Sequence, residues 1–186
     1  MVKFLLVLLG IPVLFVDSCT SRSAIPLVID SKYGSAVLTS PENDSLQFST
    51  WLNGVNMLRG AHVFQDKGHL MLIHSLEGLD LVITYSFDPA GMNLSARLVN
   101  PAKERKDISD LRLLKIKPGK NGGMPPGFCP GALDDSPWVI NPQSSDNAIE
   151  YRVDLSSSSL VLLPGEQIDL PALRLEYLPC KDITRQ

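Results

Sequence analysis

The sequence predicts an all-β protein, an antiparallel β-sandwich of roughly ten strands with little helix. Apolar and polar residues alternate with a period of two in several segments, which is typical of strands with one dry face and one wet face. Turn-forming residues separate these segments at intervals of about eight to twelve residues, as in sandwich proteins. The 14 prolines and 13 glycines also interrupt the chain too often for long helices.

The composition indicates one globular domain with a substantial core. The chain has 186 residues, of which 44% are hydrophobic and 20% are charged. The 17 basic and 20 acidic residues give a formal net charge of −3. The basic residues form no stripe of the kind that binds phosphates, so we expect no nucleic-acid partner.

The N-terminal segment, residues 1–18, has the features of a signal peptide. Lys3 supplies a positive charge, and Phe4 to Val16 is an uncharged apolar run of 13 residues. A membrane-spanning helix needs about twenty residues, so this run predicts export rather than a membrane span. Residues 19–24 are then a short polar tether, and residues 25–186 form the sandwich domain.

The sequence around the signal-peptide cleavage point is compatible with two localisations. Ser18 before Cys19 resembles a bacterial lipobox, in which the cysteine is lipidated, whereas Asp17 departs from that pattern. The protein is therefore either a cell-envelope lipoprotein, held to the membrane only through Cys19, or a freely secreted protein. Three cysteines are an odd number for an oxidising compartment. If Cys19 carries lipid, Cys129 and Cys180 remain as a disulfide pair, worth about 4 kcal/mol for so long a loop.

The first expected strands lie in the N-terminal third of the mature chain. Residues 46–52 alternate, with Trp51 on the polar side, and Asn53-Gly54 is a strong hairpin signal. Turn-forming residues fill 40–45. The strands expected here are 25–29, 36–39, 46–52 and 55–58.

The middle of the chain predicts a strand at 69–75 and then a hairpin at 79–99. Asp88-Pro89-Ala90-Gly91 forms its turn, in which the proline presets φ and the glycine permits a positive φ. The period of two places one set of apolar residues on a shared dry face. That face consists of Leu79, Leu81, Ile83, Tyr85, Phe87, Met92, Leu94, Ala96 and Leu98.

The C-terminal half contains shorter segments. Residues 102–107 form a charged, solvated bend, and residues 118–131 form a loop with five glycines and four prolines. Cys129 lies in this loop, so the expected disulfide would pin it. Further strands are expected at 111–117, 138–141, 148–155, 160–163 and 173–177.

No catalytic or metal-binding motif stands out. The three histidines are His62, His69 and His74, and a catalytic zinc site needs two or three ligands that converge. His69 and His74 lie five apart on one strand and so point to opposite faces, so we expect no metal site. The acidic pairs, Glu77 with Asp80 and Asp134 with Asp135, flank turns, where a solvated role is the simpler interpretation. The sequence therefore predicts no catalytic residue and no cofactor, and a non-enzymatic role is favoured.

Two tryptophans are the remaining candidates for ligand binding. Trp51 falls on the polar side of its strand, and Trp138 follows a loop. An exposed tryptophan ring can stack on the apolar face of a sugar. The alternative is that both rings pack in the core or at an edge of the sandwich.

Two stretches, 78–85 and 93–100, resemble the strand, turn and strand ending in asparagine of the β-supersandwich domains in α-galactosidase-type glycoside hydrolases. Leu163-Pro164-Gly165-Glu166 and the following 170–173 are similar to the closing strands of those domains. The resemblance covers less than half of the chain. It implies a sandwich domain without the catalytic barrel, so the catalytic residues of those enzymes have no counterpart here.

Three functions from different classes remain. The first is an exported, non-catalytic binding module, with carbohydrate as the first ligand to consider. The second is a structural or assembly lipoprotein of a bacterial envelope that binds protein. The third is a small hydrolase with a site assembled from residues distant in sequence.

Overall fold

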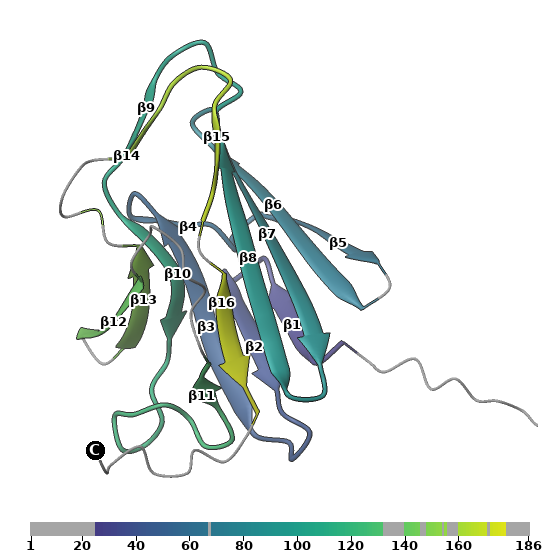
Figure 1. Ribbon diagram of the computed structural model, residues 1–186. Coiled ribbons are helices and arrows are strands. Elements are labelled where there is room, and N and C mark those ends of the chain that lie inside the picture. Colours follow the sequence, from purple (N-terminus) through teal and green to yellow (C-terminus); the bar gives the residue numbers. More distant parts are fainter. Residues whose placement is uncertain are drawn as a thin grey trace, which may run out of the picture.

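The protein is an all-β sandwich, as the sequence predicts. The computed structural model describes residues 25–66, 68–131, 140–145, 148–153, 155, 160–170 and 172–177. Every regular element in this part of the chain is a strand, and the strands pair antiparallel in two seven-stranded sheets and one two-stranded sheet. The two large sheets face each other as two layers (Figure 1).

The first sheet joins the N-terminal strands to strands from the second half of the chain. Its order is β1-β2-β3-β10-β13-β12, with β4 paired to β3. The strands are β1 (Leu27–Asp30), β2 (Ser35–Thr39), β3 (Ser45–Leu52), β4 (Val55–Asn56), β10 (Leu111–Ile116), β12 (Ile140–Ser145) and β13 (Ala148–Val153).

The second sheet is built around a meander of consecutive strands. Its order is β11-β16-β8-β7-β6-β5, and β15 also pairs with β8. The strands are β5 (His62–Asp66), β6 (His69–Leu76), β7 (Leu79–Asp88), β8 (Gly91–Val99), β11 (Cys129–Pro130), β15 (Gln167–Asp169) and β16 (Leu173–Glu176). A separate small sheet pairs β9 (Lys106–Ile108) with β14 (Leu160–Leu162).

The core lies between the two large sheets. β3 directs Leu46, Phe48 and Leu52 inward, and β7 directs its own alternate residues toward them. The rings of Phe48 and Tyr85 join the layers, with their centroids 6.1 Å apart. The predicted dry face of the hairpin is confirmed, because each of its members is buried except Phe87, which is half-buried.

Two hairpin turns use left-handed backbone at both central residues. Asn53 and Gly54 have φ of 48° and 78°, and Glu77 and Gly78 have φ of 49° and 78°. Such turns match the twist of the flanking strands. The Asn-Gly hairpin expected from the sequence is therefore present, between β3 and β4.

Gly91 serves a different purpose from the one expected. It is not among the described glycines with positive φ, so that part of the turn prediction is wrong. A Cβ at Gly91 would lie 2.1 Å from the carbonyl oxygen of Leu175 on β16. A glycine is needed at this position because the backbones of β8 and β16 approach each other closely. Close backbone approach is a common reason for glycine in a strand, besides positive φ.

Four strands, β5, β9, β11 and β15, were not predicted from the sequence. β5 has no alternating burial because all five of its residues are exposed. β9, β11 and β15 have two or three residues each, so periodicity cannot reveal them. The short strand expected at 138–141 lies partly outside the described residues, where the structure has β12 from Ile140.

No helix in the described residues is long and apolar enough to cross a membrane. The expected signal peptide, the tether and Cys19 lie outside those residues.

Candidate functional site on the outer face of the first sheet

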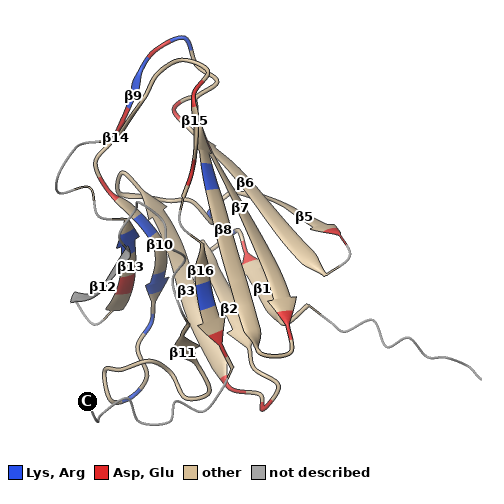
Figure 2. Ribbon diagram, viewed as in Figure 1, with Lys and Arg blue, Asp and Glu red and all other residues tan. Residues whose placement is uncertain are grey.

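A group of charged residues surrounds Trp51 on the solvent-facing side of the first sheet. β10 pairs Arg112 with Trp51 and Lys115 with Ser49. An advance of three residues along β10 therefore corresponds to an advance of two residues along β3. This irregularity is a β-bulge, and it places Arg112 and Lys115 on the same face although residues three apart normally alternate. Figure 2 shows the resulting basic segments on adjacent strands β10 and β13.

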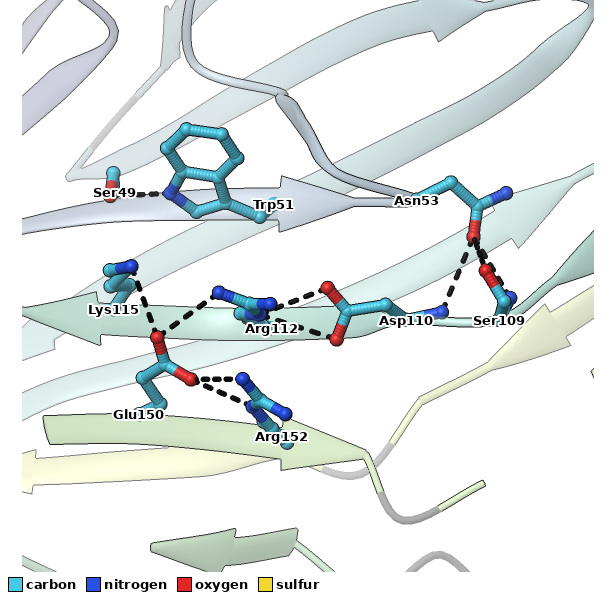
Figure 3. Close-up of polar contacts among 9 residues, drawn as sticks. All are labelled: Ser49, Trp51, Asn53, Ser109, Asp110, Arg112, Lys115, Glu150 and Arg152. Atoms are coloured by element: carbon cyan, nitrogen blue, oxygen red, sulfur yellow. Dashed lines mark hydrogen bonds and ion pairs between the residues drawn. The ribbon is translucent and has the colours of Figure 1, made fainter. Parts of the chain in front are cut away.

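Glu150 on β13 is the centre of this group. Its side chain is 0% exposed, and its carboxylate forms ion pairs with Arg112 at 3.1 Å, Lys115 at 3.2 Å and Arg152 at 2.6 Å. The three cationic side chains keep 24%, 30% and 31% of their surface exposed. They converge on the carboxylate from two neighbouring strands (Figure 3).

These cations control the charge of Glu150. Desolvation by burial acts to raise its pKa, but hydrogen bonds from Arg152 and Lys115 and the charges of Arg112 and Arg152 outweigh that effect. The pKa of the Glu150 carboxyl is therefore held below its ordinary value. The carboxylate stays ionised at neutral pH and fixes the three cations in place.

The group carries an excess of positive charge. Arg112 also pairs with Asp110, at 2.9 Å. Three cations thus face two carboxylates, leaving a net charge of +1. The loop beyond Asp110 is held by Asn53, whose side-chain oxygen accepts hydrogen bonds from the backbone of Ser109 and Asp110.

Trp51 lies beside these cations and is half-buried. Its Nε1 donates to the Ser49 hydroxyl at 2.8 Å, and the Lys115 ammonium lies 5.8 Å from the ring centroid. Trp51 is therefore outside the core, on the polar side that the alternation predicts. Trp138, the other aromatic candidate, lies outside the described residues, so a shared platform of the two rings stays a prediction.

A shallow hollow of about 450 Å³ adjoins this group on the same sheet. Among the described residues that line it, two are lysines and none is a carboxylate. Tyr33, in the turn between β1 and β2, is 71% exposed and lies at the margin of the hollow, with the Lys32 ammonium 5.2 Å from its ring centroid. The lining side chains that bear on binding are Tyr33, Gln47, Ser49, Asn56, Lys115 and Lys117.

Several of these polar groups are available to a ligand. Ser49 accepts its bond from Trp51, which leaves the hydroxyl hydrogen to donate. Asn56 is already engaged, because it donates to Gly34 and accepts from Leu58. The side chains of Gln47 and Lys117 have no hydrogen bond or ion pair within the described part of the chain.

Sequence reasoning found Trp51 but missed the residues around it. Arg112 and Lys115 share a face only because of the bulge, which the pattern of apolar residues did not reveal. Glu150 was visible on the polar side of its alternating segment, but its burial under three cations was not. Tyr33 lies in the turn between β1 and β2, where no alternation of apolar and polar residues marks it.

The other candidates do not assemble into a site. Among the described residues there is no group of three metal-ligating side chains. His69 is exposed, whereas His74 is half-buried with an Nδ1 that lacks a hydrogen-bond partner. Asp80 accepts a hydrogen bond from the Ser75 hydroxyl. Asp134 and Asp135 lie outside the described residues.

Cys129 is 7% exposed and lies in β11. Its partner in the ladder is Glu176, four positions before Cys180 in sequence. Cys180 lies outside the described residues, so the pairing of the two cysteines stays a prediction.

Comparison with models of known families, with curated proteins and with solved structures gives no match. The resemblance to accessory domains of α-galactosidase-type enzymes is thus neither supported nor contradicted.

Proposed function

We propose that this protein is a non-catalytic, exported binding module whose ligand is carbohydrate, held in the hollow on the outer face of the first sheet. The observation that carries the proposal is the lining of that hollow, which combines an exposed tyrosine ring with unpaired amide and ammonium groups. Ligand sites generally pair apolar surface with a few convergent polar groups.

The chemistry of a sugar ring matches this lining. A pyranose has an apolar face, which can stack on the ring of Tyr33, and a rim of hydroxyl groups. Gln47 offers both a donor and acceptors to such hydroxyls, Ser49 offers a donor, and Lys117 offers a cationic donor. Trp51, locked by its bond to Ser49, forms the next aromatic surface along β3.

The buried carboxylate supports the same interpretation. Glu150 holds Lys115 at 3.2 Å, so one lysine in the hollow is fixed before any ligand arrives. A side chain that is already ordered loses little entropy on binding.

The test is binding to a panel of immobilised polysaccharides and soluble oligosaccharides, measured for the wild type and for variants of the hollow. We expect Tyr33→Ala to weaken binding by about tenfold or more, equivalent to ~1.4 kcal/mol. Tyr33→Phe, which keeps the ring, is the matched control and should bind nearly as well as the wild type. The proposal fails if no polysaccharide binds, or if neither Tyr33→Ala nor Gln47→Ala changes the affinity.

A second candidate function is that of an envelope lipoprotein that binds protein. Large apolar side chains exposed on β5 and β6 favour it, since Val63, Phe64 and Met71 are 41%, 51% and 36% exposed. Affinity capture from an envelope extract, in parallel with the polysaccharide panel, distinguishes the two functions, because a binder of sugar should release its partners on addition of the free sugar.

A further inference from the structure

β5 is the outermost strand of the second sheet, and nothing described covers it. It lies at the end of the strand order, and Figure 1 shows it at the outer margin of the molecule. All five of its residues are exposed. Its exposed apolar side chains occur on both faces, with Val63 directed to one and Phe64 to the other.

Two of the other strands at the ends of the sheet orders, β11 and β12, contain proline, whereas β5 does not. Proline removes the backbone donor that an added strand would need. Pro130 ends β11 and Pro142 lies within β12. β5, His-Val-Phe-Gln-Asp, contains no proline and no lysine.

The register of β5 determines which of its backbone groups point outward. Asp66 pairs with His69 across a two-residue loop, and the pair that closes such a loop exchanges hydrogen bonds. Hydrogen-bonded and non-hydrogen-bonded pairs then alternate along the ladder, so Val63 and Gln65 belong to the non-hydrogen-bonded pairs. Their N–H and C=O groups therefore face the open edge.

The sequence of β5 is complementary to itself in the antiparallel direction. If Phe64 lies opposite its own copy, His62 lies opposite Asp66 of the second chain, and Val63 lies opposite Gln65. His62, Phe64 and Asp66 share the outer face of the sheet, since they pair with Ile73, Met71 and His69 of β6. The basic side chain thus meets the acidic one, and the aromatic ring meets its copy.

We propose that two copies of this protein pair through β5, around a two-fold axis at Phe64, so that their second sheets form one continuous sheet. Val63 and Gln65 of each chain, whose backbone groups face outward, supply the new ladder. Phe64 is then in a non-hydrogen-bonded pair, in which opposing side chains approach most closely. Met71, 36% exposed beside Phe64, extends the apolar contact on that face.

The first experiment is the oligomeric state, measured by analytical ultracentrifugation over a range of concentrations. We expect the wild type to dimerise. His62→Glu places two acidic residues opposite each other, and Asp66→Lys places two basic ones opposite each other, so each single change should weaken dimerisation by about tenfold or more. The double variant, His62→Glu with Asp66→Lys, restores opposite charges and should recover the dimer.

Recovery of the dimer in the double variant distinguishes a loss of β5 pairing from a loss of folding, because a fold damaged by either single change would not be restored by the second. Val28→Glu, on the exposed edge of β1, is the control for added charge and should leave the dimer intact. A wild type that stays monomeric at every soluble concentration overturns the proposal, and so does a double variant no better than the singles.

A second experiment tests the register directly. In a Cys19→Ser background, Phe64→Cys places one cysteine opposite its copy and should form an intermolecular disulfide on mild oxidation. Gln65→Cys is the matched control, because that residue lies opposite Val63 and faces the other side of the sheet. Equal cross-linking of the two variants, or none with Phe64→Cys, contradicts the proposed axis.

Discussion

At the scale of single residues, the Glu150 carboxylate couples the stability of the first sheet to pH. Its folded-state pKa is lower than in the unfolded chain, because three cations favour the ionised form. The unfolded state therefore binds this proton more readily. The stability that Glu150 contributes is present above its ordinary pKa of 4.5 and is lost as pH falls through the lower folded value.

We expect Glu150→Gln to lower the free energy of unfolding at pH 7 by about 1–3 kcal/mol, since the change leaves three half-exposed cations without their shared partner. The difference between wild type and variant should shrink as the pH falls below the ordinary pKa of 4.5, because the unfolded chain then takes up the proton before the folded protein does. Urea unfolding at several pH values measures both quantities. A difference that is constant across that range would contradict the assigned coupling.

Gly91 gives a second prediction at this scale. A methyl group there would meet the Leu175 carbonyl oxygen at 2.1 Å, and the neighbour is backbone that cannot rotate away. We expect Gly91→Ala to destabilise the fold by about 2–4 kcal/mol through separation of β8 and β16. Gly123→Ala is the control, because nothing lies within 4 Å of its Cβ position and its φ is not positive. Thermal unfolding of both variants checks the contrast.

At the scale of secondary-structure elements, the alternation in β7 assigns a dry face and a wet face. Ile83 is 0% exposed in the core, so Ile83→Ala should cost about 2–5 kcal/mol. Thr84 points to the outer face and is half-buried, so Thr84→Ala should cost less than about 1 kcal/mol. Chemical denaturation of the two variants measures both losses of unfolding free energy. Similar losses would mean that both faces of β7 are packed.

Long alternating strands were predictable from the sequence, whereas the exposed β5 and the short β9, β11 and β15 were not. β3, β7 and β8 each bury one face, so their period of two is visible in the residues alone. β5 is exposed on both faces and leaves no such pattern. The candidate site was likewise predictable only in part. The alternation of apolar and polar residues places Trp51 on the polar side of β3. The bulge in β10 that brings the cations beside Trp51 depends on pairing between strands distant in sequence.

At the scale of the whole molecule, the arrangement of β11 and β16 bears on the expected disulfide. Cys129 is paired in the ladder with Glu176, four positions before Cys180 in sequence, so β16 ends beside Cys129. If the protein is exported, we expect Cys129 and Cys180 to be joined by a disulfide. Intact-mass analysis after alkylation, with and without reductant, tests the bond. Two freely alkylated thiols at these positions without reductant would exclude it.

If the protein is a lipoprotein, its attachment to the membrane depends on Cys19. If this cysteine carries lipid, Cys19→Ser should move the protein from the membrane fraction to the soluble fraction, because the polar tether that follows has no affinity for a bilayer. The same variant should leave thermal stability unchanged. Lipidation is contradicted if the wild-type protein is already soluble and its N-terminus is another residue. Free secretion would then be the remaining prediction for its localisation.

The connectivity of the two sheets also sets an order of folding. β5 to β8 pair with their neighbours in sequence, so this meander forms by closing short loops. The remaining strands depend on distant partners: Thr50 bonds to Leu113, 63 positions away, and Arg174 reaches Asp88 across 86 positions. Such contacts form slowly because loop entropy is lost before they are made. Until the first sheet covers the meander, its dry face and the open edge of β5 are exposed together, and refolding yield should therefore fall as protein concentration rises.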